Sequence, residues 1–266
     1  MSRGLSDRIR EASIVRMQEA LSRLGVSGNT LTCRQKASLD QEGYLVLPDV
    51  MSTRQLGNYR LRLDQLYEQE GELAGLELTQ EVGCRRLTNL INKDAMFDCC
   101  MTYPPVLAAV SHILQGDFKT NSLNFRDPMP GYGLQRLHSD HEVAVIPGHY
   151  LKVNSLWLVD EQSSDNGPTR LVPGSHLSGQ HPRDAMRNHH DRHPDEIHLI
   201  HRAGAVIIFN AHIWHGGTRN ISGQFRRTLH ASYILRDHPQ QLNEREHLRP
   251  VTADRLSQEL RALMDV

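Results

Sequence analysis

The sequence has almost no net charge and no long apolar run. Its 30 lysines and arginines nearly balance 31 acidic residues, so the formal net charge is −1. Without a basic stretch we expect no nucleic-acid partner and no binding to a membrane surface. No segment approaches the roughly 18 uninterrupted apolar residues of a transmembrane helix, and residues 1–21 contain no apolar core of the signal-peptide type. We therefore expect a cytoplasmic protein.

Cysteine is also scarce. The four cysteines (Cys33, Cys84, Cys99 and Cys100) form no CxxC pair and show no spacing typical of a disulfide framework. We therefore interpret them as reduced thiols. The adjacent pair Cys99 and Cys100 is interpreted as half-buried helix surface, and a redox-active pair is the alternative. Histidine, by contrast, is abundant: the chain has 16 histidines, and most of them follow residue 137, which directs the search for functional residues to the C-terminal half.

Helical spacing of apolar residues predicts helices in the first and last parts of the chain. Ser52 and Gln55 form a capping-box pair at the start of one of them. The predicted helices cover residues 5–24, 52–69, 105–115 and 252–264, and a short strand is predicted at 43–47.

Between about residues 118 and 237, short strand-like runs alternate with Gly, Pro, Asn and Asp, which is typical of an all-β barrel or sandwich. The predicted strands are 120–126, 134–140, 150–159, 169–172, 204–209 and 225–235. We expect a mainly β fold with α-helices that forms a single domain over residues 1–266. Its parts would be an N-terminal helical layer (about 1–117), a β-barrel core (about 118–237) and a C-terminal helix (about 252–264).

One H-x-D motif has the context of a metal site. Residues i and i+2 of a strand point the same way, so His138 and Asp140 can bind one metal ion. H-x-D also occurs at 189–191 and 193–195, but that stretch is polar, lacks strand alternation and is interpreted as a solvated loop. Two imidazoles and one carboxylate on one side of an iron ion form the facial triad of non-haem Fe(II) oxygenases. A third ligand must therefore come from a distant strand.

The segment GAVIIFNAHIWHGGTRN offers two histidines for this third position, His212 and His215. The apolar run in the first half of this segment predicts a buried strand. Gly216 and Gly217 follow His215 and allow another group to approach the backbone closely. A histidine here is either a metal ligand or a hydrogen-bonded core residue, and the residues alone leave both interpretations open.

Several segments occur together in a recognisable order: LNFRDPMPG, LHSD, NGPTRLVPGSH, GAVIIFNAHIWHGG, and N-x-S followed by an arginine eleven residues after His215. With these motifs, over about residues 120–236 and more weakly from about residue 38, the sequence resembles the phytanoyl-CoA dioxygenase (PhyH) family of iron- and 2-oxoglutarate-dependent oxygenases. The resemblance implies a double-stranded β-helix core, that is, a jelly-roll of the cupin type.

The resemblance also implies a set of site residues. Fe(II) would be held by His138, Asp140 and His215, with 2-oxoglutarate and O2 as co-substrates. Arg226 stands at the family's position for the far carboxylate of 2-oxoglutarate, a task that suits the planar fork of a guanidinium. Arg227 would point to the opposite face of the same strand.

Other residues receive secondary roles from the resemblance. Asn124 and Asn154 align with positions that contact the co-substrate in similar enzymes, and the alternative is that they satisfy strand backbone groups. His176 is interpreted as architectural and Trp157 as packing. Asp140 stands where related halogenases have a small residue, which favours hydroxylation over halogenation.

The expected function is therefore hydroxylation of an unactivated C–H bond of a small molecule, with release of succinate and CO2. A natural-product or amino-acid-like intermediate is the expected kind of substrate, and a monomer or homodimer the expected assembly. The alternatives are a desaturase or cyclase with the same cofactors, a zinc hydrolase with the same three ligands, and a non-catalytic barrel. Substrate specificity is expected in loops over the barrel mouth, at about residues 70–95, 127–134, 141–149 and 178–200.

Overall fold

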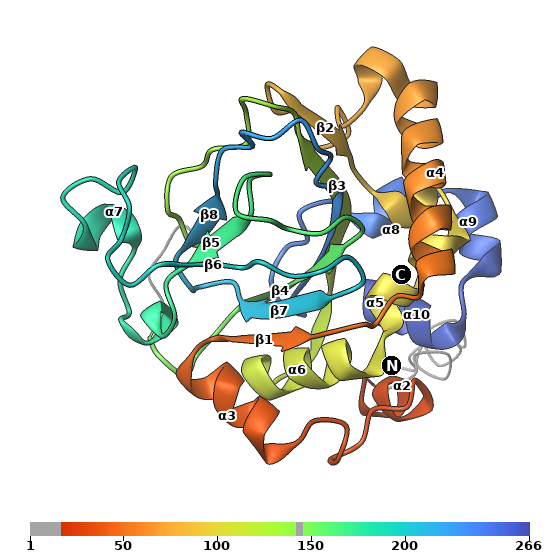
Figure 1. The fold of residues 1–266 in the computed structure, drawn as a ribbon. Helices are drawn as coiled ribbons and strands as arrows, with labels where there is room; N and C mark the ends of the chain where they lie inside the picture. The colour runs from red at the N-terminus through yellow and green to blue at the C-terminus, as the bar shows by residue number, and fades with distance from the viewer. Residues whose placement is uncertain (1–16, 142–145) are drawn as a thin grey trace.

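Two antiparallel sheets form the centre of the protein, as the computed structural model of residues 17–141 and 146–266 shows (Figure 1). The larger sheet has six strands in the order β1-β7-β4-β9-β3-β2, and the smaller has three in the order β6-β5-β8. The larger sheet does not close on itself. The arrangement confirms the predicted jelly-roll core. The strands are β1 (Tyr44–Leu47), β2 (Cys84–Leu87), β3 (Phe118–Pro128), β4 (Lys152–Leu158), β5 (Thr169–Leu171), β6 (Ile197–His198), β7 (Val206–Asn210), β8 (His215–Gly217) and β9 (Thr228–Leu235).

Strands β3 and β9 bury both of their faces, and the two faces differ in chemistry. Leu123 and Phe125 of β3 and Tyr233 of β9 belong to the main hydrophobic core, beside helical residues. The alternate residues of the same strands, such as Asn124 and His230, line a cavity between the two sheets. Because strand side chains alternate between faces, one strand can pack against helices and supply polar groups to a site.

Helices cover the outer face of the larger sheet (Figure 1). The capping box predicted for α4 is confirmed: the side chain of Ser52 accepts a hydrogen bond from the Gln55 N–H, and the Gln55 side chain accepts one from the Ser52 N–H. The predicted apolar face of α4 is buried, and Leu63 is completely so, which stabilises the fold by about 2 kcal/mol for a leucine. The helices are α2 (Met17–Arg23), α3 (Cys33–Gln41), α4 (Thr53–Glu70), α5 (Cys99–Thr102), α6 (Pro104–Leu114), α7 (Pro182–Ala185), α8 (Glu244–His247), α9 (Pro250–Arg255) and α10 (Gln258–Met264). Short 3-10 helices are η1 (Gly71–Leu73), η2 (Leu90–Asn92), η3 (Ala95–Phe97) and η4 (Ser175–Leu177).

Two predicted elements are wrong. Residues 134–140 do not form a strand, because their N–H groups are shared among several partners: the N–H of Leu137 bonds to the carbonyl of His189, whereas that of Asp140 bonds to the carbonyl of Ala211. The C-terminal helix predicted at 252–264 is two helices, α9 and α10. It is interrupted at Leu256 and Ser257, where the serine side chain caps α10.

The structure also contains elements that were not predicted, among them α3, α7, α8, β2, β6 and β8. Of these, β2 lies within the predicted helical layer and joins the larger sheet, as does the predicted strand β1. Residues 5–16 of the first predicted helix lie outside the described residues.

All four cysteines are free thiols, with Cys99 exposed and Cys100 buried in α5. Within the described ranges no helix combines the length and apolar character that a membrane crossing requires.

Candidate metal centre and its two cavities

The backbone brings His138 and His215 side by side. The N–H of each residue donates to the carbonyl oxygen of the other, at 2.9 Å in both directions. This close pairing depends on the glycines after His215: a Cβ on Gly217 would lie 2.5 Å from the carbonyl oxygen of Gly133, and one on Gly216 would lie 2.9 Å from that of Arg136. The Gly-Gly pair therefore lets the irregular segment that carries His138 lie directly against β8.

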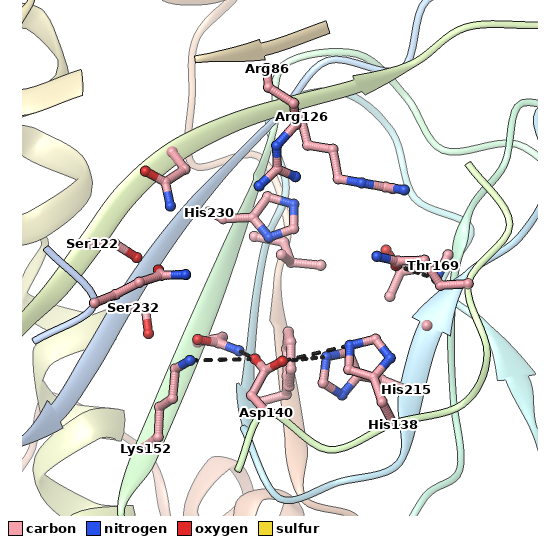
Figure 2. Close-up of a pocket in the computed structure, with 18 of the residues that line it drawn as sticks. Arg86, Ser122, Arg126, His138, Asp140, Lys152, Thr169, His215, His230 and Ser232 are labelled. Atoms are coloured by element: carbon pink, nitrogen blue, oxygen red, sulfur yellow. Dashed lines mark hydrogen bonds and ion pairs between the residues drawn. The ribbon is translucent and has the colours of Figure 1, made fainter. Parts of the chain in front are cut away.

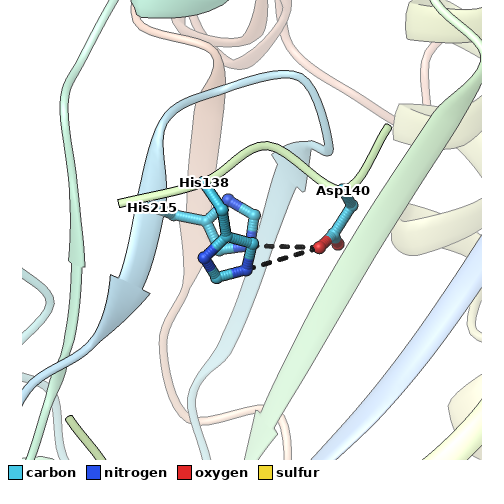
Figure 3. Close-up of side chains that lie close together, drawn as sticks. All are labelled: His138, Asp140 and His215. Atoms are coloured by element: carbon cyan, nitrogen blue, oxygen red, sulfur yellow. Dashed lines mark ion pairs between the residues drawn. The ribbon is translucent and has the colours of Figure 1, made fainter. Parts of the chain in front are cut away.

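Asp140 completes a cluster with these two histidines (Figure 3). One ligand atom from each of the three side chains lies within 4.8 Å of the other two. Oδ1 of Asp140 is 3.6 Å from Nε2 of His138 and 3.7 Å from Nε2 of His215. Of the described residues, these three form the one His, Cys, Asp and Glu group able to hold a metal ion.

Hydrogen bonds set the orientation of both imidazoles. Nδ1 of His138 lies 3.0 Å from the carbonyl oxygen of Arg136, and Nδ1 of His215 lies 2.9 Å from that of Ile213. Because a carbonyl oxygen only accepts, each Nδ1 must carry the proton, which leaves the Nε2 lone pair directed at the cluster. This is the usual way in which a neighbouring group fixes the tautomer of a metal-binding histidine.

The ionisation states suit a divalent cation. Burial alone would raise the pKa of Asp140, but Lys152, the two histidines and Asn154 outweigh it, so that pKa lies well below the ordinary carboxyl value. Burial and then the neighbouring His138 lower the pKa of His215 to about 4. The carboxylate and the His215 imidazole are therefore ready to bind a metal at neutral pH. Two imidazoles and one carboxylate on one side fit Fe(II) with open positions opposite.

An inner cavity of about 180 Å³ lies between the two sheets beside the triad (Figure 2). The structure places Arg226 in its wall, 1% exposed. The Nε of Arg226 has no hydrogen-bond partner among the described residues, and its Nη1 is 3.5 Å from the hydroxyl of Thr228. Burial and then Arg126 lower the pKa of Arg226 to about 9. A buried guanidinium without a carboxylate is costly, so this position suits an incoming anion.

Arg227 lies on the opposite face of the chain from Arg226. Its guanidinium pairs with Asp64 of α4 at 2.8 Å and with Asp160 at 2.9 Å. The two neighbouring arginines therefore have separate surroundings, one facing a cavity and the other satisfied by two carboxylates.

Asn124 and Asn154 also line the inner cavity, and each has a definite partner. The side-chain amide of Asn154 donates to Oδ2 of Asp140. The side-chain oxygen of Asn124 accepts the N–H of Asn89 at 3.2 Å, where the backbone is left-handed at the start of η2. Asn154 therefore holds the Asp140 carboxylate, whereas Asn124 anchors a backbone turn.

The inner cavity contains charged residues that sequence reasoning missed, namely Arg86, Arg126 and Lys152, together with His230. Alternation offered a signal here: Arg126 shares a face of β3 with Asn124, and His230 is an even number of residues from Arg226, which lies just before β9. Burial and the three arginines lower the pKa of His230 well below its usual value. The same alternation places Lys152 on the face of β4 that carries Asn154, whereas no local pattern pointed to Arg86.

A second, outer cavity of about 490 Å³ borders two of the triad residues, His138 and Asp140. It shares His138 and Asp140 with the inner cavity and is otherwise formed by residues 135–141 and by the histidine-rich loop after η4. The stretch interpreted as a solvated loop is exposed over most of residues 183–195, but His189 is half-buried and its Nδ1 lies 3.2 Å from the carbonyl oxygen of Leu137. The loop is thus hydrogen-bonded to the segment that carries the metal ligands.

The remaining histidine and tryptophan interpretations agree with the structure. Nε2 of His176 lies 3.2 Å from the carbonyl oxygen of Asp40, and its ring fills the space that a Cβ on Gly43 would need. Trp157 is in the core against Tyr103. His212 is buried and accepts the N–H of Leu151 through Nε2 at 3.1 Å, so this nitrogen is not available to the metal cluster.

Comparison with known proteins adds four relationships. A model of the phytanoyl-CoA dioxygenase (PhyH) family matches residues 39–228. Dioxygenase trt7 of Aspergillus terreus is 26% identical over 220 residues, which are 77% of this chain and 74% of trt7. The structure of HygX from Streptomyces hygroscopicus with nickel and 2-oxoglutarate bound has a TM-score of 0.63 at 18% identity, covering 79% of this chain and 89% of HygX. The carbocyclase SnoK from nogalamycin biosynthesis also has a TM-score of 0.63, at 20% identity, covering 86% of this chain and 92% of SnoK.

Proposed function

The chain belongs to the phytanoyl-CoA dioxygenase family of non-haem iron, 2-oxoglutarate-dependent dioxygenases. We propose that it hydroxylates an unactivated C–H bond of a small molecule. Succinate and CO2 are the products from the co-substrate. The observation that carries the proposal is the convergence of His138, Asp140 and His215 beside the unpaired, buried guanidinium of Arg226.

The residues of the chain divide the work. His138, Asp140 and His215 would hold the iron from one side, and Asn154 keeps the Asp140 carboxylate turned toward it. Bound iron would supply the activation of O2 and the oxidation of the C–H bond, driven by decarboxylation of 2-oxoglutarate. Arg226 would bind the far carboxylate of 2-oxoglutarate through a charge-assisted, two-oxygen contact. Holding both reactants in place is the protein's contribution to the rate.

Ring closure or desaturation is the second candidate outcome of the same chemistry. It is favoured by the structural likeness to SnoK, which is described as a carbocyclase. The position of the substrate carbon beside the metal decides between hydroxylation and these outcomes. Product analysis by mass spectrometry separates them, because hydroxylation adds one oxygen atom whereas desaturation and ring closure remove two hydrogens.

The first experiment is an anaerobic titration of the Fe(II)-loaded protein with 2-oxoglutarate, followed by the visible charge-transfer absorption of the chelate. We expect the band in the wild type, and we expect Arg226→Ala to need far more 2-oxoglutarate to develop it. A protein that retains zinc and shows no band would instead be the hydrolase alternative. A protein that binds no metal would be a non-catalytic barrel.

A further inference from the structure

The two cavities meet at the metal site, and this arrangement assigns them different ligands. His138 and Asp140 form the wall between them. If the proposed function holds, 2-oxoglutarate occupies the inner cavity, where Arg226 lies. The inner cavity is about 180 Å³. The outer cavity is larger, about 490 Å³, and adjoins it at Gln135, His138 and Asp140, which makes it the candidate site for the primary substrate.

The inner cavity keeps a surplus of positive charge when both reactants are bound. Four cationic side chains line it: Arg86, Arg126, Lys152 and Arg226. Three described carboxylates lie near them. Asp140 is 3.9 Å from Lys152, Glu81 binds Arg126 through both oxygens and is 3.5 Å from Arg86, and Asp127 accepts the backbone N–H of Arg226. Four cations against three carboxylates leave one positive charge in excess. An Fe(II) ion and a 2-oxoglutarate dianion cancel each other. The remaining field therefore attracts an anion to the adjoining outer cavity.

The outer cavity contains a buried histidine whose ring is oriented but not satisfied. Nδ1 of His181 lies 2.8 Å from the hydroxyl of Ser139, the residue between the two metal ligands His138 and Asp140. Nε2 of His181 has no hydrogen-bond partner among the described residues, although the residue is only 6% exposed. Burying an unpaired ring nitrogen is costly, which indicates that a ligand group completes its hydrogen bonding.

Arg136 adds a positive charge to the same cavity. It lines the outer cavity, is exposed, and forms no hydrogen bond or ion pair through its side chain with any described residue. Asp140 is the single carboxylate among the described residues that line this cavity, and it is a metal ligand. Leu137 and Pro182 are the only apolar side chains there among the described residues, so the cavity provides no channel for a long hydrocarbon chain.

We propose that the outer cavity is the primary-substrate site and that it binds a small polar molecule through an oxyanion group, a carboxylate or a phosphate. Arg136 binds the anion by charge. The Ser139 hydroxyl donates to the carbonyl oxygen of His141 and so accepts from Nδ1 of His181, which leaves Nε2 to accept a hydrogen bond from a hydroxyl or P–OH group of the substrate. This proposal rests on the proposed function for its assignment of the inner cavity to 2-oxoglutarate. It excludes a long-chain acyl group as the part that enters the site.

The test uses inorganic phosphate as the probe. The protein is loaded with Co(II) and saturated with 2-oxoglutarate, and the 31P line width of phosphate is measured as phosphate is added. Protein loaded with Zn(II) is the diamagnetic control. We expect saturable broadening with Co(II) alone, because the bound phosphate lies close to the metal. Displacement by acetate and by methylphosphonate then ranks carboxylate against phosphate as the preferred group.

Two variants and a matched control identify the residues. Arg136→Gln and His181→Asn should each weaken phosphate binding by at least about fivefold, since each loses a charge-assisted or buried hydrogen bond. The asparagine amide takes the place of Nδ1 and keeps the bond to Ser139, so His181→Asn removes mainly the Nε2 contact. Arg187→Gln, an exposed arginine of the same loop that does not line the cavity, should bind phosphate like the wild type.

Two results would overturn the proposal. One is the absence of broadening in the Co(II) protein with 2-oxoglutarate bound. The other is equal broadening in the wild type and both variants, which would identify an adventitious ion only. Failure of the proposed function is recognised separately, because the Fe(II) protein would then show no charge-transfer band with 2-oxoglutarate. Phosphate affinity would in that case be measured by calorimetry on the metal-free protein with the same variants.

Discussion

Asn154 donates a hydrogen bond to Oδ2 of Asp140, whereas the other oxygen, Oδ1, faces Nε2 of both triad histidines. The two oxygens of one carboxylate therefore have separate tasks. Asn154 comes from β4 of the larger sheet, and His215 comes from β8 of the smaller sheet. The carboxylate is thus held between groups from both sheets, and its rotation is restricted before a metal binds.

Asn154→Ala should weaken Fe(II) binding by about tenfold, the lower end of the effect typical of a group that orients a metal ligand. Competition with a chelator under nitrogen would measure the affinity. Asn124→Ala is the matched control: its metal affinity should stay unchanged, whereas its unfolding free energy should fall because the N–H of Asn89 loses its acceptor. Equal metal affinities in wild type and Asn154→Ala would contradict the orienting role.

His138→Ala should abolish Fe(II) binding, because it removes one of three ligands. The loss of metal affinity should exceed the roughly 10- to 100-fold loss that is typical when a group orienting a ligand is removed. Metal content after anaerobic reconstitution and gel filtration is the readout. His190→Ala, which changes an exposed histidine of the histidine-rich loop, should retain a full complement of iron. If the two variants lost iron equally, the metal would lie elsewhere.

Arg226→Met and Arg227→Met should have opposite effects. Arg226→Met should raise the dissociation constant for 2-oxoglutarate by about 10- to 100-fold, the value of a charge-assisted contact. Its stability without co-substrate should not fall, because the wild-type guanidinium is buried and unpaired.

Arg227→Met should leave 2-oxoglutarate affinity unchanged and should lower the unfolding free energy by about 1–3 kcal/mol, since Asp64 and Asp160 lose their partner. Calorimetry with 2-oxoglutarate and urea unfolding measure the two properties. Loss of co-substrate affinity in Arg227→Met would reverse the assignment of the two arginines.

The metal-free protein should lose stability on mild acidification, in part through His212. Burial and then His141 lower the pKa of His212 to about 3, whereas an unfolded histidine titrates near about 6.5. Below pH ~6.5 the unfolded chain therefore takes up a proton that the folded chain does not. Stability falls as the pH drops toward 3, by up to about 1.4 kcal/mol per pH unit from this residue.

His212→Gln should reduce this dependence, because the glutamine oxygen can accept the N–H of Leu151 without titrating. Urea unfolding of the metal-free proteins between about pH 7 and pH 5 compares the slopes. Identical slopes of unfolding free energy against pH in the wild type and His212→Gln would show that His212 is not buried in its neutral form.

Gly217→Ala should destabilise the fold by about 1–3 kcal/mol, as overpacking of a tight contact does, and should disturb the pairing of His138 with His215. The added Cβ would meet the carbonyl oxygen of Gly133 at 2.5 Å. Gly223→Ala is the control, since nothing lies within 4 Å of its added Cβ. Urea unfolding together with iron content distinguishes a loss of stability from a loss of the site.

Local patterns were sufficient for much of the fold. The capping box and apolar face of α4 lie within one helix, so the sequence alone predicts both. Strand alternation is likewise local, and it correctly separates the surroundings of Arg226 and Arg227. Local pattern could not decide between His212 and His215 as the third metal ligand. The two residues are distinguished by the distant backbone groups with which they form hydrogen bonds, Leu151 for His212 and His138 for His215.

The errors of the sequence-based prediction come from contacts between distant parts of the chain and, in one case, from a local cap. Segment 134–140 has strand-like residues, but its hydrogen bonds go to three separate parts of the chain, which no local pattern records. The break between α9 and α10 follows from a serine cap inside a run of helical spacing. Arg86 reaches the inner cavity because β2, which was not predicted, pairs with β3 at the edge of the larger sheet.

The separation of the inner and outer cavities has a consequence for how this family diversifies. Strands of both sheets build the inner cavity, so a change there disturbs the whole jelly-roll. The outer cavity takes much of its wall from the loop between η4 and β6, which tolerates insertion and replacement. If the outer cavity holds the primary substrate, a loop transplanted between relatives would alter substrate preference and leave the oxidising part of the enzyme in place, whereas the contribution of Arg136 would stay with the recipient chain.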